Sequence, residues 1–279
     1  MESGLYIVAT PIGNLGDISH RAVEVLRSAD LIAAEDTRHS RHLLQHFAID
    51  TPVFAYHEHS DDRAQQRILS VLGEGGTVAL VSDAGTPLIS DPGFKLVRQV
   101  QDAGFKVVPI PGACAAIAAL SVAGLATDKF LYEGFLPAKA AQRESRLTAL
   151  AQQTATLVFY EAPHRVIDAL SAMVDILGVD REAVLAREIT KAFETIRRGT
   201  LGELKEFVAA DPNQRRGEIV IVVAGGAKVE AVLDAGLERL LLQLAEEMPG
   251  KRAAAIVAEF SGLRKNQLYD FLLTQRSSQ

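Results

Sequence analysis

LYIVA at residues 5–9 runs directly into TPIGNLGD at residues 10–17, and this junction decides the fold. The apolar run predicts a short buried strand, and the Pro-Gly segment predicts a turn that exposes backbone groups. A helical pattern begins near Ser19. A strand, an exposed turn and a helix in this order are how open α/β folds build ligand sites at the carboxyl ends of their strands.

The same unit recurs twice further along the chain. An apolar run at residues 78–82 leads into DAGTP at 83–87, and another at 107–110 leads into PGAC at 111–114. In an open sheet, ligands bind outside the carboxyl ends of neighbouring parallel strands. Three such loops therefore predict one cleft with several walls.

Up to about residue 127, apolar runs alternate with helical periodicity. Strands are predicted at 5–9, 31–34, 53–56, 78–82 and 107–110, and helices at 19–29, 40–47, 61–72 and 92–103. Asp91-Pro92 predicts the start of the last helix, because Asp caps free N–H groups and Pro fits the first turn. The alternation predicts a largely parallel sheet covered by helices on both faces.

A second α/β block follows. Its predicted strands are 156–160, 183–187, 195–199 and 218–223, and its helices are 142–151, 165–177 and 201–208. Thr200 and Glu203 have the spacing of a capping box. No helix separates the strands at 183 and 195, which favours an antiparallel element and hence a mixed sheet.

The last part of the chain differs from the two α/β blocks, because only helices are predicted there. These helices lie at residues 237–248, 251–260 and 264–274, and they are separated by Pro249-Gly250 and by a short turn at 261–263. Two helices joined by a Gly-containing turn are typical of a helix-turn-helix, although a hairpin that only packs on the core or on a partner chain fits as well. We therefore predict an N-terminal α/β domain at 1–127, a C-terminal α/β domain at 128–228 and a helical extension at 229–279.

Composition and charge narrow the class of protein. Hydrophobic residues make up 48% of the 279 residues, which permits a large buried core. The net charge of −6 gives no global attraction to nucleic acid, so RNA binding would need local basic clusters. Such clusters lie at residues 38–42, 197–198, 215–216, 251–252 and 264–265.

The single cysteine, Cys114, excludes an internal disulfide and a multi-cysteine metal site. Its Ala- and Ile-rich surroundings indicate a small buried hydrophobe in a reducing, cytoplasmic setting. No signal-peptide core precedes the first strand, and Pro and Gly interrupt the uncharged segment 107–127, so we expect no membrane association.

The loops lack the motifs of phosphate cradles and metal sites: GKS/GKT, GxGxxG, CxxC and HExxH are all missing from the sequence. Small residues at a strand end let backbone groups approach a flat, mostly uncharged ligand, so the loops suit a nucleoside-like molecule. Asp83, at a strand tip, could bind an ammonium group or sugar hydroxyls. Ordinary loop geometry is the alternative.

Seven stretches, in order along essentially the whole chain, resemble the ribosomal RNA small subunit methyltransferase I family of the tetrapyrrole-methylase superfamily. They are VATPIGNLGDIS (8–19), AAEDTR (33–38), ALVSDAGTPLISDPG (79–93), PIPGACAA (109–116), YEGFLPAK (132–139), FYEAPHR (159–165) and REITKAFET (187–195). Each alone is weak, but seven in sequence are specific. One place departs from the family pattern: Ser60 follows His57-Glu58-His59 where the family has Asn.

The resemblance implies an S-adenosylmethionine-dependent enzyme that methylates the 2′-hydroxyl of a decoding-region cytidine in 16S rRNA, with the small ribosomal subunit as partner. It implies the class III methyltransferase fold, in which two α/β domains hold the cofactor between them, with a helix-turn-helix-like extension. Members of the superfamily commonly form homodimers, so it also implies a dimer, although the sequence itself leaves dimerisation open.

Carried over position by position, the resemblance assigns the cofactor contacts to loops and strand ends. These contacts are Pro11, Val81, Ser82, Asp83, Gly85, Thr86, Ile89, Ala113, Cys114, Ala115, Tyr160, Glu188, Thr190, Gly217 and Glu218.

Methyl transfer from a sulfonium requires an acceptor oxygen in line with the S–CH₃ bond and help in losing its proton. The candidate bases, none singled out by spacing, are Glu35, Asp36, Glu161, His164 and Lys191. Arg38 and Arg165 are candidates for substrate phosphate, because guanidinium binds phosphate bidentately. Surface ion pairs are the alternative for both.

This chemistry needs no Lewis acid, so we predict no metal, although His57 and His59 could hold one with Asp61 or Asp62. Two other functions stay open. A relative that methylates a tetrapyrrole or another small molecule would suit the negative charge and the aromatic content of 6%. A DNA-binding regulator would sense a ligand with its α/β part and read a groove with its tail.

Overall fold

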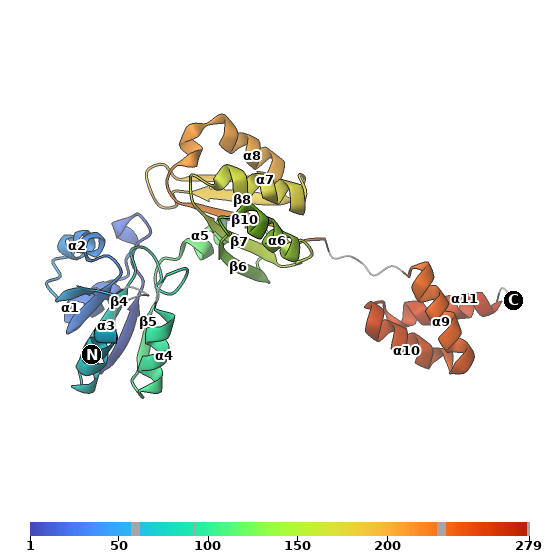
Figure 1. Ribbon diagram of the computed structural model, residues 1–279, viewed down its shortest axis with the longest axis horizontal. Coiled ribbons are helices and arrows are strands. Elements are labelled where there is room, and N and C mark those ends of the chain that lie inside the picture. Colours follow the sequence, from blue (N-terminus) through green and yellow to red (C-terminus); the bar gives the residue numbers. More distant parts are fainter. Residues whose placement is uncertain (57–61, 92, 228–232, 278–279) are drawn as a thin grey trace. The chain divides into compact units, whose positions relative to one another are not determined.

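The computed structural model describes residues 1–56, 62–91, 93–227 and 233–277 (Figure 1). Contacts within the chain divide it into two compact units, residues 1–226 and 227–279. The larger unit contains two five-stranded sheets. The three-domain division at residues 127 and 228 stays a prediction.

The first sheet is entirely parallel, which confirms the sequence prediction. Its strands, in the spatial order β3-β2-β4-β1-β5, are β1 (Gly4–Val8), β2 (Leu31–Ala34), β3 (Val53–Ala55), β4 (Thr77–Val81) and β5 (Val107–Ile110). Because β1 and β4 are neighbours, the loops that follow them lie side by side at the carboxyl edge of the sheet.

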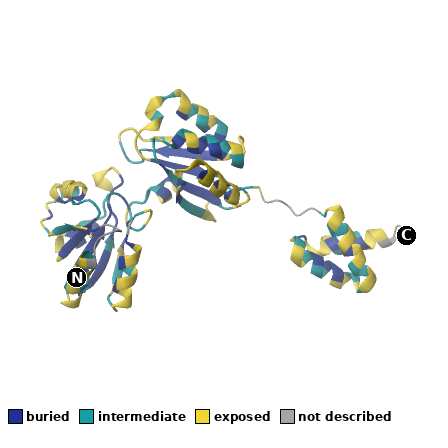
Figure 2. Ribbon diagram, in the orientation of Figure 1, coloured by how far each residue is buried: buried dark blue, intermediate teal, exposed yellow. Residues whose placement is uncertain are grey.

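Four helices cover this sheet on its two faces: α1 (His20–Ser28), α2 (Thr37–His46), α3 (Asp62–Gly73) and α4 (Phe94–Asp102). Successive strand residues point to opposite faces. Tyr6 and Val8 therefore pack with α1 and α2, whereas Leu5 packs with α3 and α4. The three central strands, β1, β2 and β4, are accordingly buried and the outer helix faces exposed, as Figure 2 shows.

The second sheet is mixed, as predicted. In the spatial order β6-β7-β10-β8-β9, its strands are β6 (Phe130–Phe135), β7 (Thr156–Glu161), β8 (Glu182–Arg187), β9 (Thr195–Thr200) and β10 (Ile219–Val223). Only β6 and β7 pair in parallel; the other pairs, including β8 with β9, are antiparallel.

The helices of the second sheet are α5 (Ala115–Val122), α6 (Ala140–Leu150), α7 (Val166–Leu177) and α8 (Leu201–Ala210). α6, α7 and α8 cover one face, and α5 covers the other. α8 begins with the predicted capping box, in which Glu203 N–H donates to Thr200 Oγ1 and Thr200 N–H donates to Glu203 Oε2. We call the first sheet with α1–α4 the first lobe, and the second sheet with α5–α8 the second lobe.

Two local predictions are wrong. β6 is missing from the predicted strands. α4 begins at Phe94: Gly93, with φ of 134°, is its N-cap, and no side chain caps the helix, so the predicted cap by Asp91 is wrong, while residue 92 lies outside the described residues. Leu88 and Ser90 also have positive φ, which is strained for residues other than glycine, and Ile89, Ser90 and Asp91 line the site described below.

The smaller unit contains α9 (Ala235–Glu247), α10 (Gly250–Ser261) and α11 (Lys265–Ser277) around a core of its own. The Asp234 side chain caps α9, and Gly262, with φ of 72°, ends α10 in the left-handed conformation. This arrangement confirms the predicted helix-turn-helix. Across the described ranges, no helix combines the length and the apolar character that a bilayer crossing needs.

Candidate active site

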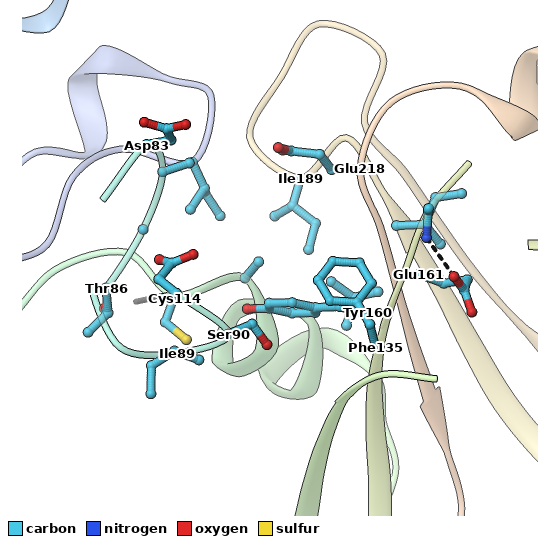
Figure 3. Close-up of a pocket in the computed structure, with 18 of the residues that line it drawn as sticks. Asp83, Thr86, Ile89, Ser90, Cys114, Phe135, Tyr160, Glu161, Ile189 and Glu218 are labelled. Atoms are coloured by element: carbon cyan, nitrogen blue, oxygen red, sulfur yellow. Dashed lines mark hydrogen bonds between the residues drawn. The ribbon is translucent and has the colours of Figure 1, made fainter. Parts of the chain in front are cut away.

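A cavity of about 400 Å³ in the larger unit is lined by both lobes, and we call it the first cavity. Figure 3 shows Asp83 and Thr86 of the first lobe on one side, and Ile189 and Glu218 of the second lobe on the other. Its volume lies in the range of small-molecule sites, about 300–1,000 Å³.

Backbone and side-chain hydrogen bonds join the three Pro-Gly loops on the first-lobe side. Thr10 and Gly85 exchange two backbone hydrogen bonds, of 2.8 and 3.1 Å. Thr86 Oγ1 donates to the carbonyl of Ala113 at 2.9 Å. Gly85 has φ of 82°, a conformation that favours glycine, and a Cβ there would lie 3.2 Å from Ile12. The loops thus meet at one edge, as their placement after β1, β4 and β5 predicts.

Two aromatic side chains of the second lobe, Phe135 and Tyr160, line the first cavity. The ring of Tyr160 lies 5.7 Å from that of Phe135 and 5.2 Å from that of Tyr132. The N–H of Ala116, in the first turn of α5, donates to the Tyr160 hydroxyl at 3.1 Å. Burial raises the pKa of this hydroxyl above its ordinary value, so Tyr160 presents an uncharged aromatic face.

The ionisable lining of the first cavity is acidic. Its charged residues are Glu35, Asp83, Asp91, Glu161 and Glu218, with no Lys, Arg or His among the described residues that line it. Burial raises the pKa of Asp91 despite a hydrogen bond from Ser82, and the nearby Asp83 adds to the rise. Burial also raises the pKa of Glu161. A wall that has carboxylates and no Lys, Arg or His among its described residues favours a cationic ligand and repels phosphate.

A second cavity, of about 280 Å³, adjoins the first. The residues that line both cavities are Ile12, Asp83, Ala84 and Glu218. The remaining walls of the second cavity are Thr10, Pro11, Gly13, Leu15, His39, Ser40, His42, Leu43, Ser82 and Lys191. These residues come from the β1 loop, from α2, from the end of β4 and from the loop after β8. Unlike the first cavity, the second has basic groups on its wall.

Lys191 is held in place by two carboxylates. Its Nζ lies 2.9 Å from Glu188 Oε1 and 2.9 Å from Glu218 Oε2. Burial alone would lower the pKa of Lys191, but the hydrogen bonds to Glu188 and Glu218 outweigh burial and raise it. The side chain lies over Gly13, where a Cβ would come within 2.4 Å of Lys191 Cγ. Lys191 is therefore a fixed cation and poorly suited to act as a base.

The structure brings most of the expected cofactor residues to these two cavities. The first cavity is lined by Asp83, Gly85, Thr86, Ile89, Cys114, Ala115, Tyr160, Gly217 and Glu218. The second is lined by Pro11 and Ser82. The four that line neither are Val81, Ala113, Glu188 and Thr190. Cys114 is only half-buried, so the expectation of a buried cysteine is wrong.

The expected catalytic residues are more scattered. Glu35 and Glu161 line the first cavity, but Figure 3 shows Glu161 well away from Asp83, with its carboxylate bonded to a backbone N–H. Asp36 pairs with Arg38 at 3.0 Å, mainly by a side-chain hydrogen bond that lowers the pKa of Asp36 to about 2. Neither lines a cavity, and the Arg38 side chain is 88% exposed.

Arg165 is engaged within the second lobe. Its Nε lies 3.4 Å from Glu161 Oε1, and its guanidinium donates to the carbonyl of Leu136. Its side chain is mostly buried. These contacts favour an internal ion pair over a role of Arg165 in binding substrate phosphate.

The sequence analysis did not predict that α2 lines the site. The segment 38–42 stands out as basic, but His39, Ser40 and His42 also line the second cavity. Ser40 lies four residues before the buried Leu44 and so shares its inward face, a spacing visible in the sequence. A serine on a core-facing stripe was the available signal.

The segment that raised the question of a metal, His57-Glu58-His59 with Asp61, lies outside the described residues. In the ranges that the structure describes, no three His, Cys, Asp or Glu side chains cluster as metal ligands would.

Comparison with known families agrees with this architecture. Residues 4–205 match the family described as Tetrapyrrole (Corrin/Porphyrin) Methylases. Residues 231–276 match the family described as RsmI C-terminal HTH domain.

Full-length relatives carry one name, Ribosomal RNA small subunit methyltransferase I. The protein from Pseudomonas aeruginosa is 57% identical to this chain, over 99% of each. The protein from Escherichia coli O157:H7 is 53% identical, over 99% of this chain and 96% of its own length. The protein from Mesorhizobium japonicum is 50% identical, over 98% and 92%.

Solved structures at lower identity share the fold. A cobalt precorrin-4 methyltransferase superposes with a TM-score of 0.60 at 18% identity, over 79% of this chain and 94% of its own. A uroporphyrin-III C-methyltransferase from Thermus thermophilus, complexed with S-adenosyl homocysteine, gives 0.55 at 16% identity, over 79% and 97%. These values show a common two-lobed architecture.

Proposed function

Since the chain belongs to the ribosomal RNA small subunit methyltransferase I family, we propose that it transfers a methyl group from S-adenosylmethionine to 16S rRNA. The names of the relatives support the small-subunit RNA as substrate. The finer part of the proposal is the acceptor atom, the ribose 2′-oxygen of a decoding-region cytidine. The observation that carries the proposal is the pair of adjoining cavities, of which the first has carboxylates and no described basic side chain and the second also has His39, His42 and Lys191 on its wall.

The residues of the first cavity fit the methyl donor. S-adenosylmethionine carries a sulfonium and an ammonium group, and five carboxylates line the cavity without a Lys, Arg or His among its described residues. The neutral ring of Tyr160, with Phe135 and Ile189, supplies the apolar surface that a nucleoside base needs. When bound, the donor supplies an electrophilic methyl group.

Asp83 is the residue best placed to assist the acceptor oxygen. It lines both cavities, so it borders the place where a donor and an acceptor would meet. Glu218 shares that wall, but its carboxylate is bonded to Lys191. Asp83 Oδ1 accepts the N–H of Asp36 at 3.0 Å, and a carboxylate can accept further hydrogen bonds. We assign to Asp83 the role of receiving the proton of the ribose hydroxyl.

The smaller unit offers a basic start to its last helix. Arg264 and Lys265 are exposed at the N-terminal end of α11, where a recognition helix meets a groove. Leu263 and Leu268 beside them are buried in the core of the unit, so the exposed residues stand on a packed scaffold. This supports a role for the smaller unit in docking the RNA substrate.

Transfer of a labelled methyl group tests the proposal. The full-length protein is mixed with S-adenosylmethionine carrying a radioactive methyl, and with assembled small subunits, naked 16S rRNA or a tetrapyrrole in parallel. Label in the RNA of either ribosomal sample supports the function, and the stronger of the two identifies the substrate form. Label only in the tetrapyrrole contradicts it.

A further inference from the structure

Ser40 carries a buried hydroxyl group without a hydrogen-bond partner among the described residues. The residue is 4% exposed. Ser40 lies on the inner face of α2 and lines the second cavity. Buried polar groups in folded proteins are nearly always bonded, so an unpartnered hydroxyl on a residue that lines a cavity calls for an explanation, and a ligand in that cavity supplies one. The second cavity therefore has a polar site without an assigned ligand.

Basic groups surround that site. His39 and His42, exposed and three residues apart on α2, line the cavity, and an imidazole donates N–H in either protonation state. Lys191 lines the cavity from the second lobe, and Glu188 and Glu218 account for two of the three N–H donors of its ammonium group. A ligand with anionic oxygens fits these donors.

The residues shared by the two cavities determine that a ligand in the second cavity lies beside the ligand of the first. In methyl transfer the donor sulfur, the methyl carbon and the acceptor oxygen lie in line, so the acceptor must adjoin the donor site. Asp83 and Ala84 separate the two cavities and line both. An acceptor in the second cavity would lie next to a methyl donor in the first, at the border that these residues form.

We propose that the second cavity binds the acceptor nucleotide of the RNA, with its ribose beside Asp83 and a backbone phosphate toward α2. Ser40 donates its hydroxyl hydrogen to an oxygen of that nucleotide, and His39 and His42 bind the phosphate. The assignment rests on the proposed function and adds to it the place where the RNA chain enters the site.

The competing ligand for this cavity is the cofactor itself. Pro11 and Ser82, which the family resemblance assigns to the cofactor, line the second cavity and not the first. His39, His42 and Lys191 are less favourable neighbours for the sulfonium and ammonium groups of the donor than the first cavity, whose described wall has carboxylates and no Lys, Arg or His. An RNA phosphate faces the same groups favourably.

Two variants test the assignment in the full-length protein. Ser40→Ala removes the hydroxyl and leaves no other group unpaired, so it should fold at least as well as the wild type. His39→Ala/His42→Ala removes the rim donors, and His46→Ala, an exposed histidine of the same helix that lines neither cavity, is its matched control. Each protein is assayed for melting temperature, for the Kd of S-adenosyl homocysteine and for the KM of small-subunit RNA.

We expect the KM for RNA to rise about tenfold in Ser40→Ala and at least as much in the double variant. The cofactor Kd should stay within twofold of wild type in both, and His46→Ala should match the wild type throughout. A weaker cofactor Kd with an unchanged KM for RNA would assign the cavity to the cofactor and overturn the inference. Unchanged values for both would overturn it too. Wild-type protein that methylates no small-subunit RNA would instead be a failure of the proposed function.

Discussion

Lys191 and Glu218 form an ion pair of 2.9 Å on the wall of the second cavity. The pair joins the loop after β8 to the start of β10, and Glu188 completes it from the same loop. Glu188 and Thr190 have φ of 52° and 68°, which is strained for residues other than glycine. The Glu188 carboxylate offsets part of this strain, because it accepts both the Lys191 ammonium and the N–H of Glu218. Strain of this kind marks a segment shaped for a ligand.

Substitutions of Lys191 distinguish the effect of its positive charge on activity from the effect of its exact shape. In Lys191→Met we expect kcat/KM for RNA to fall at least tenfold, since two carboxylates then face the phosphate without a cation between them. Lys191→Arg should recover part of the activity. Lys95→Met, on the exposed face of α4, is the control for loss of a surface ammonium. Because the pKa of Lys191 is raised, it stays protonated at neutral pH, and the pH–rate profiles of wild type and Lys191→Arg should have the same shape. A rate limb below pH 9 that disappears in Lys191→Arg would show that Lys191 acts as a base.

Removal of the negative charge at the shared wall should affect the chemical step. In Asp83→Asn we expect kcat to fall by about 10²–10⁴, the usual contribution of a general base. The amide oxygen can still accept the N–H of Asp36, so the melting temperature should change little. Asp102→Asn, at an exposed ion pair of α4, controls for the loss of one carboxylate. Single-turnover rates with saturating RNA measure the effect, and a kcat within threefold of wild type would exclude Asp83 as the proton acceptor.

Glu161 should make the stability of the protein depend on pH. Burial raises the pKa of this carboxyl above 4.5 in the folded state. A group whose pKa is raised by folding contributes stability that is fully present below its unfolded pKa and is lost as pH rises through the folded value. The melting temperature of wild type relative to Glu161→Gln should therefore be highest near pH 4 and decline toward pH 8. Each unit of pKa shift corresponds to about 1.4 kcal/mol. A difference that grows with pH would mean that the ion pair with Arg165 dominates instead.

The basic start of α11 should contribute to RNA affinity through phosphate contacts. In Arg264→Ala/Lys265→Ala we expect weaker RNA binding and a plot of log K against log salt that is shallower by roughly 0.7–0.9 per lost contact. The affinity for S-adenosyl homocysteine should not change, because neither residue lines a described cavity. Arg98→Ala, on α4, is the control for surface charge. An unchanged salt slope would show that the smaller unit does not dock RNA by these residues.

The sequence predicts the parallel first sheet well because its strands are continuous apolar runs between helical patterns. It does not predict β6, whose residues FLYEGF mix apolar and polar positions and contain a bulge between Tyr132 and Gly134. Gly134, with φ of 66°, supports that irregular pairing. Local pattern cannot signal a strand that is defined by its pairing with β7.

Part of the candidate site can likewise be predicted from the sequence, and part of it cannot. The loops after β1, β4 and β5 are predictable, since strand order and Pro-Gly turns bring them to one edge. The second cavity is not, because α2 and Lys191 are some 150 residues apart and meet only through the packing of two lobes. Asp91-Pro92 has the composition of a helix start, yet Gly93, with positive φ, is the N-cap of α4, and Ser90 also has positive φ.

Nucleoside analysis of the methylated RNA is the most direct test of whether the protein methylates a ribose 2′-oxygen of 16S rRNA. Small-subunit RNA from a strain without this activity is incubated with the full-length protein and S-adenosylmethionine, digested to nucleosides and examined by mass spectrometry. We expect one new product, a cytidine whose added methyl stays with the ribose when the glycosidic bond is broken. A methyl that stays with the base, or RNA that gains no methyl at all, would contradict it.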